Sequence, residues 1–385
     1  MKKIANFVLL IILSVALIAC ESNGEEPTPS GVPNGLEPIL PIAGCDEPTL
    51  EGGWVCIWAD EFDGPEIDET KWTFEIDGRG GGNNELQYYR RENAFIEDGK
   101  LIIEARREDY MNKLYTSARL NSKYKGDFQY VRVVVSAQMA GGRGTWPAIW
   151  MLPTMNAYGI WPNSGEIDIM EYVGYDPDRV HATIHTRRFN HNLGTQLGRA
   201  RDLDNAETEH HTYELIWGPG DMRFLVNGNQ YFQAGYNAAL NTDVPYHHAF
   251  PFDQLFHLVL NVAVGGNWGG AQGVDPNIFP TSMSIDYVRV YQLDYATLDI
   301  ESPSEPLFIQ PAQLANTIWW RASTDDIGVE KYAIYIDGEL YDHASLNQYT
   351  FSRLTKGQTY EIQVQAVDFV GRTSPKSETA LFTYE

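Results

Sequence analysis

The stretch that decides the fold is Gly165–Gly174, which reads GEIDIMEYVG. Its apolar residues favour a β-strand, and alternate residues of a strand point to the same face. Glu166 and Asp168 therefore share one face, whereas Glu171 has the opposite parity. One extra residue, a β-bulge around Met170, would return Glu171 to the face of the other two acids. The stretch predicts a strand that packs its isoleucines into a core and presents three carboxylates on an open surface.

Two carboxylates directed at one bond are the groups that glycoside hydrolysis requires, one as nucleophile or base and the other as acid. A third carboxylate between them would raise the pKa values of its neighbours by like-charge repulsion. The alternative interpretation is a solvated strand face, and the spacing of the acids alone favours that alternative. The flanking sequence favours the catalytic interpretation instead.

The composition indicates a globular chain with a sizeable core. It has 385 residues, of which 43% are hydrophobic and 21% charged, and this length predicts two domains. The formal net charge of −24 argues against nucleic acid and anionic membranes as partners. It is compatible with a neutral polysaccharide such as a glucan. We expect a monomer.

Residues 1–20 are predicted to be a secretory leader, with two lysines near the start and a short apolar run. The run ends in LIAC, which resembles a bacterial lipoprotein box and implies acylation at Cys20. The alternative is an ordinary signal peptide with an incidental cysteine. Residues 21–44 are rich in Pro, Gly, Glu and Ser, which predicts a flexible linker. We therefore expect an exported lipoprotein of the cell envelope, at the outer membrane or cell surface, whose only membrane contact is the lipid anchor.

Two further cysteines, Cys45 and Cys56, lie near the start of the predicted fold. An exported protein meets oxidising conditions, so a disulfide between them is favoured over two free thiols.

The rest of the chain predicts an all-β protein with two β domains. Residues 45–293 contain many short strands separated by turn residues, which is typical of a β-sandwich or jelly roll. Residues 299–385 resemble a fibronectin type III module, an immunoglobulin-like β-sandwich, with Tyr360 as the candidate for its tyrosine corner. Such modules are most often spacers, and sugar binding is the alternative.

Four stretches join the acidic strand in one pattern. They are GTWPAIWM at Gly144–Met151, VHATIH at Val180–His185, GGNWGG at Gly265–Gly270 and NNELQYY at Asn83–Tyr89. Together these residues resemble the family 16 glycoside hydrolases, specifically the bacterial laminarinases. The resemblance runs from DEF at Asp60–Phe62 to DYVRVY at Asp286–Tyr291. Members without the extra residue resemble lichenases, and Met170 is present here.

The resemblance implies a jelly roll with a concave cleft and a retaining mechanism that needs no cofactor. Glu166 would be the nucleophile and Glu171 the acid/base, while Asp168 would hydrogen-bond to the nucleophile. A retaining mechanism requires the two carboxyl groups about 5–5.5 Å apart, so the strand must bend.

Further residues are expected to contact sugars. Trp146 and Trp150 would form a stacking floor, with Trp161 and Trp268 at neighbouring subsites. Burial in the core is the alternative for Trp150. His185 would belong to a polar wall of the cleft, an interpretation that we favour over a zinc site shared with His181. The matching stretches also imply hydrogen bonds to sugars from Asn84 and Arg119.

The resemblance also implies a structural calcium ion on the convex face, with ligands from Glu61, the carbonyl of Gly99 and the carboxylate of Asp286. The alternative is that these acids are ordinary surface residues.

The sequence thus predicts a retaining endo-β-1,3-glucanase, a laminarinase. Two alternatives remain: a non-hydrolytic protein that binds or senses β-glucan, and an enzyme acting on mixed-linkage β-1,3-1,4-glucan. The extra residue at Met170 and the WPAIW stretch favour β-1,3-glucan.

Overall fold

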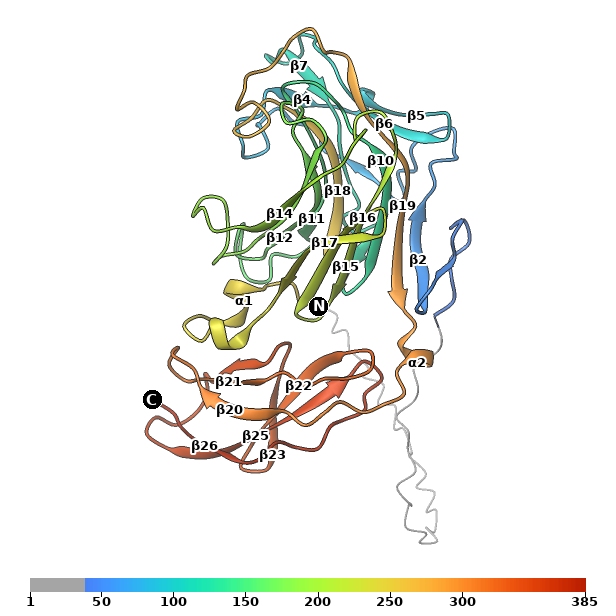
Figure 1. Ribbon diagram of the computed structural model, residues 1–385. Coiled ribbons are helices and arrows are strands. Elements are labelled where there is room, and N and C mark those ends of the chain that lie inside the picture. The colour runs from blue at the N-terminus through green and yellow to red at the C-terminus, as the bar shows by residue number, and fades with distance from the viewer. Residues whose placement is uncertain (1–38) are drawn as a thin grey trace, which may run out of the picture. The chain divides into compact units, whose positions relative to one another are not determined.

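The structure is a computed structural model, and it describes residues 39–385 (Figure 1). The predicted leader at 1–20, the lipidation candidate Cys20 and most of the predicted linker at 21–44 lie outside these residues. Within the described part of the chain, no helix combines the length and apolarity needed to cross a membrane.

The first domain is built on two antiparallel sheets. One sheet contains, in spatial order, β1 (Thr49–Leu50), β2 (Trp54–Asp60), β19 (Thr281–Leu293), β10 (Arg132–Gln138), β15 (His211–Gly218), β16 (Asp221–Val226) and β17 (Asn229–Gly235), and β6 (Lys100–Ala105) links β5 (Ala94–Glu97) to β19. The other contains β14 (Leu197–Asp202), β13 (Arg179–His185), β12 (Glu166–Tyr172), β11 (Thr145–Pro153), β18 (Phe256–Val264), β8 (Arg119–Asn121) and β3 (Thr73–Phe74), and β9 (Asp127–Phe128) pairs with β18.

The remaining elements of this domain are short. They are a parallel pair, β4 (Gln87–Tyr89) and β7 (Tyr115–Ser117), the 3₁₀ turns η1 (Arg91–Asn93) and η2 (Ala238–Leu240), and the single-turn helices α1 (Tyr246–Ala249) and α2 (Tyr295–Leu298).

The core lies between the two sheets, and β18 shows how the pleat divides it from the cleft. Leu258, Leu260 and Val262 point inward and belong to the core. Asn261 and Ala263 lie on the opposite face and line a cleft. Each buried leucine or valine stabilises the fold by about 1.5–3 kcal/mol, and a one-residue slip would turn this whole set toward solvent. Burial therefore fixes which side chains face the cleft.

The C-terminal β-sandwich has two sheets of its own. One contains β20 (Leu307–Pro311), β21 (Thr317–Arg321) and β24 (Gln348–Thr350); the other contains β23 (Glu339–Ala344), β22 (Val329–Ile336), β25 (Thr359–Asp368) and β26 (Ala380–Thr383). A separate core that includes Trp320 and Val364 fills the space between them. The hydroxyl of Tyr360 accepts a hydrogen bond from the Thr355 N–H at 2.9 Å, which is the contact of a tyrosine corner. The predicted all-β fold with a jelly roll and a smaller β-sandwich is confirmed.

Candidate active site

Strand β12 contains a bulge between its acids. Asp168 pairs with Thr183 and Glu171 pairs with His181, so three steps along β12 match two steps along β13. The pairing of β12 with β11 shifts at the same place. Met170 is fully buried, because the bulge lets two consecutive apolar residues enter the core. The bulge predicted around Met170 is confirmed.

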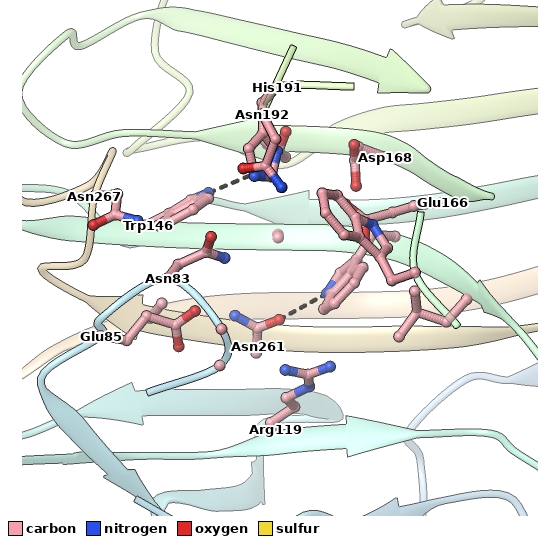
Figure 2. Close-up of a pocket in the computed structure, with 18 residues that line it drawn as sticks. Asn83, Glu85, Arg119, Trp146, Glu166, Asp168, His191, Asn192, Asn261 and Asn267 are labelled. Atoms are coloured by element: carbon pink, nitrogen blue, oxygen red, sulfur yellow. Dashed lines mark hydrogen bonds between the residues drawn. The ribbon is translucent and has the colours of Figure 1, made fainter. Parts of the chain in front are cut away.

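The bulge brings the three acids to one surface. Glu166, Asp168 and Glu171 all line a cleft of about 430 Å³ on the face of β11, β12 and β18 (Figure 2). A second hollow, which adjoins the first, shares Glu166 and Glu171 and continues over β13 and β14. The acids therefore lie where the two hollows meet, with room for a chain of sugars on both sides.

Burial dominates the electrostatics of these acids. It raises the pKa of Glu166 to about 8, with a further contribution from the negative charge of Asp168, and His185 opposes the rise. Burial and Asp168 likewise raise the pKa of Glu171 to about 8. Burial alone raises the pKa of Asp168 well above its usual range. Three buried carboxylates at this spacing cannot all be ionised near neutral pH, so the group retains protons.

Two neighbours give the acids different surroundings. Trp146 Nε1 donates to Glu171 Oε1 at 3.0 Å, which leaves Oε2 free to hold a proton. His185 Nε2 lies 3.3 Å from Asp168 Oδ2 and 3.8 Å from Glu166 Oε1. Glu166 thus lies beside an imidazole ring, whereas Glu171 accepts a hydrogen bond from an indole N–H.

The predicted aromatic residues surround the acids. Trp146, Trp150 and Trp161 line the first hollow, and Trp268 lines the second. The rings of Trp146 and Trp268 meet edge to face at 5.5 Å, so these two tryptophans join the linings of the two hollows. Apolar ring faces of this kind stack on sugar rings.

The predicted polar residues divide into two groups. Arg119 lines the first hollow with its guanidinium 4.6 Å from the Trp150 ring centroid, and His185 lines the second. The Asn84 amide instead donates to Asn267 Oδ1 at 2.9 Å, and the neighbouring Asn83 takes its place on the cleft surface. The loop turns at Asn84, which has a positive φ of 60°, and a sugar contact from Asn84 stays a prediction.

Other lining residues were not predicted one by one, although three of them belong to the stretches Asn83–Tyr89 and Gly265–Gly270. Asn83, Glu85, His191, Asn192, Asn261 and Asn267 complete the wall of the first hollow (Figure 2). They come from loops and from an apolar strand. The period-2 parity of β18 could have identified Asn261, which accepts from Trp150 Nε1 at 2.8 Å and orients that ring.

One group in the cleft has the composition of a metal site. Glu166, Asp168 and His185 offer ligand atoms within 4.8 Å of one another. A cation bound there would occupy the carboxylate of Glu166 and make it unavailable as a nucleophile.

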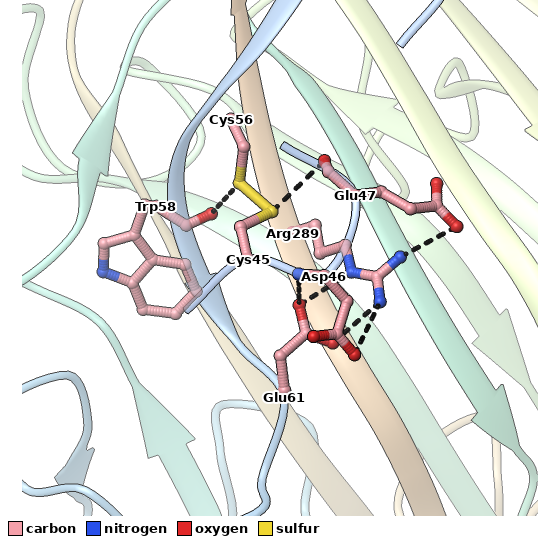
Figure 3. Close-up of a disulfide and its surroundings, with 7 residues drawn as sticks. All are labelled: Cys45, Asp46, Glu47, Cys56, Trp58, Glu61 and Arg289. Carbon is pink, nitrogen blue, oxygen red and sulfur yellow. Dashed lines mark hydrogen bonds and ion pairs between the residues drawn. A yellow bond between two sulfur atoms is a disulfide. The ribbon is translucent and has the colours of Figure 1, made fainter. Parts of the chain in front are cut away.

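The structure contains a Cys45–Cys56 disulfide near Glu61, one of the residues expected to bind calcium (Figure 3). Both oxygens of Glu61 accept hydrogen bonds from Arg289, each at 2.8 Å. Asp286 lies 3.5 Å from Lys100. Both acids are thus paired with cationic side chains of the chain itself, and the calcium site at Glu61, Gly99 and Asp286 stays a prediction.

A jelly roll whose cleft combines buried, proton-sharing carboxylates with tryptophans defines a glycoside hydrolase that acts on polysaccharides. Residues 82–289 match the sequence model of the glycosyl hydrolases family 16, and the chain belongs to this family. A β-glucanase of Rhodothermus marinus is 47% identical over 257 residues, which are 65% of this chain and 90% of that protein.

Two solved structures are similar to the first domain. The laminarinase from Rhodothermus marinus superposes with a TM-score of 0.60 at 48% identity, covering 62% of this chain and 97% of that one. A non-specific endo-β-1,3(4)-glucanase of family 16 superposes with a TM-score of 0.58 at 41% identity, covering 67% and 95%. The match to the family model ends before the C-terminal β-sandwich.

Proposed function

We propose that this enzyme is a retaining endo-β-1,3-glucanase that cleaves laminarin-like glucans. The observation that carries the proposal is the bulged strand β12, which directs Glu166, Asp168 and Glu171 into one cleft. Similarity to a laminarinase supports β-1,3-glucan as the substrate. The open hollows on both sides of the acids support cleavage within a chain rather than at its end.

The proposed reaction has two displacements. Glu166 attacks the anomeric carbon while Glu171 Oε2 gives its proton to the departing glycosidic oxygen, which forms a glycosyl-enzyme. Glu171 then takes a proton from a water molecule that attacks the same carbon and releases Glu166. Two inversions restore the β configuration. Asp168, a buried carboxyl group next to His185, shares the protons of this group with Glu166 and Glu171.

Product analysis on a panel of glucans tests this proposal. Laminarin should yield soluble oligosaccharides, and proton NMR of the fresh products should show the β-anomer first, before mutarotation. An initial α-anomer would contradict retention. Absence of new reducing ends would favour the alternative of a protein that only binds β-glucan, although the presence of both acids argues against it.

Mixed-linkage β-1,3-1,4-glucan is a second candidate substrate. The similarity to a glucanase described as non-specific for 1,3 and 1,4 bonds supports it. Comparison of kcat/KM on laminarin and on mixed-linkage glucan decides which substrate the cleft prefers.

The pH profile should reflect the shared protons. Activity requires an ionised Glu166, so the rate should fall as the pH drops below the raised pKa of this group. Activity also requires a protonated Glu171, so the rate should fall again as the pH rises above about 8. Asp168→Asn removes one of the three carboxyl groups that share these protons, and with it the negative charge that raises both pKa values whenever Asp168 is ionised, so both limbs should move to lower pH. Glu85→Gln, a neutralised acid in the same cleft, is the control and should leave the limbs in place. Unmoved limbs in Asp168→Asn would contradict the coupling.

We also propose an exported lipoprotein of the cell envelope, anchored through Cys20 and built with a fibronectin type III-like spacer. The LIAC stretch supports the anchor, and the contact of the Tyr360 hydroxyl with Thr355 supports the module assignment. A calcium ion at Glu61, Gly99 and Asp286 stays a prediction of the family resemblance.

A further inference from the structure

A second cluster of acids lies in the C-terminal β-sandwich, at the point where this domain begins. Asp299, Asp325 and Asp326 each offer a carboxylate oxygen, and these oxygens lie within 4.8 Å of one another. Asp299 directly follows α2, whereas the other two lie in the loop between β21 and β22. The Ile300 N–H donates to Asp326 Oδ2 at 3.2 Å. The cluster therefore joins the first residues of the domain to a loop within it.

The buried member of this cluster has a free oxygen. Asp299 is only 1% exposed. Arg372 Nη1 donates to its Oδ1 at 2.8 Å, but Oδ2 is buried and has no hydrogen-bond partner within residues 39–385. Asp325 is similar: its Oδ2 accepts two backbone hydrogen bonds, and its buried Oδ1 accepts none from the described residues. Burying a carboxylate oxygen costs free energy when no new partner replaces its hydrogen bonds to water. Asp299 Oδ2 and Asp325 Oδ1 therefore both indicate a missing ligand.

A fourth acid adds to the uncompensated charge. Asp368, the last residue of β25, is fully buried. Arg372 contacts this acid as well as Asp299, because its backbone N–H donates to Asp368 Oδ1 at 2.7 Å. Asp368 Oδ2 again has no partner in the part of the chain that the structure describes. Burial, then the charges of Asp368 and Asp325, raise the pKa of Asp299 to about 6. Within residues 39–385, the one ion pair made by these four acids is that between Asp299 and the Arg372 guanidinium.

We propose that these acids form a calcium site that fastens the start of the C-terminal β-sandwich to its own loops. All the free donors are hard oxygens, which calcium prefers, and they come from separate segments whose irregular geometry calcium tolerates better than magnesium does. Asp326 is exposed, so water can complete the six to eight ligands that calcium takes. This site shares no residue with the calcium site expected at Glu61, Gly99 and Asp286, and it does not depend on the proposed glucanase activity.

Calcium titration calorimetry on the chelator-treated full-length chain tests the site. Asp326→Asn is the first variant, because this residue is exposed and asparagine keeps an acceptor for the Ile300 N–H. Glu378→Gln, which neutralises another exposed acid of the same domain, is the matched control. We expect Asp326→Asn to weaken one binding event by about tenfold or more, and the control to bind as the wild type does. Magnesium should bind this site more weakly than calcium.

A second variant and a second measurement keep the result interpretable. Asp286→Asn should leave this binding event intact, and loss of the event in that variant alone would assign the calcium to the convex face and overturn the proposal. Calcium at about 100 times its Kd should raise the unfolding midpoint of the C-terminal β-sandwich by roughly 10 °C in the wild type and less in Asp326→Asn. Equal binding and equal shifts in the wild type and Asp326→Asn, or no calcium binding at all, would also overturn it.

Discussion

Replacing Glu166 by alanine is expected to lower kcat on laminarin by at least about 10⁴-fold, because the glycosyl-enzyme cannot form without its nucleophile. Glucan binding should persist, since the tryptophans and Arg119 still line the cleft. Initial rates and a pull-down on insoluble β-1,3-glucan measure the two properties separately. Loss of binding together with activity would indicate misfolding rather than a missing nucleophile, and circular dichroism distinguishes these cases.

Azide gives this variant a sharper readout. The small anion fits the space that the carboxylate leaves and attacks an activated aryl β-glycoside directly, in a single inversion. The product should therefore be an α-glycosyl azide, identified by its anomeric proton coupling. A β-glycosyl azide from Glu166→Ala would assign the nucleophile to a different carboxylate and overturn the proposed roles.

Replacing Glu171 by alanine should lower kcat on laminarin by about 10²–10⁴-fold, the usual contribution of a general acid. With a substrate that has a dinitrophenyl leaving group, the rate of the first displacement should fall much less, because this group departs without protonation. Comparison of the two substrates separates acid catalysis from a general loss of the fold, which would affect both equally.

Azide also distinguishes Glu171→Ala from Glu166→Ala. Glu166 is still present in Glu171→Ala, so a glycosyl-enzyme forms and azide then attacks it from the opposite side. The two inversions should give a β-glycosyl azide. Trp146→Phe is a useful companion variant, because it removes the hydrogen bond to Glu171 Oε1 while keeping an aromatic ring. It should change the alkaline limb of the pH profile more than substrate binding.

Short-range patterns in the sequence were sufficient to predict the all-β fold and the central acids. The two-residue period of a strand is set by the backbone, so the parity of Glu166, Asp168 and Glu171 already required a bulge, and the pairing of β12 with β13 has one at Met170. The tryptophans followed from the same rule, because Trp146 and Trp150 share a face of β11.

The loops around the cleft could not be predicted in this way. Asn83 rather than Asn84 lines the first hollow, at a turn of the backbone, and His191 reaches the cleft from a loop with no regular period. The pairing of Glu61 shows the same limit, because nothing local in the sequence indicates that Arg289, on a neighbouring strand, contacts both of its oxygens.

The sequence by itself determined which residues alternate, and hence that three acids and two tryptophans would share one surface. Only the tertiary structure decided how those acids hold their protons, because burial and the distance to His185 depend on which strands pair. The same is true of Asp299, Asp325 and Asp368, which are far apart in the chain. Only folding brings Arg372 into contact with Asp299 and Asp368, and only folding lets the charges of Asp325 and Asp368 raise the pKa of Asp299. Side-chain direction is a property of the local backbone, whereas charge and hydration depend on neighbours that distant segments supply.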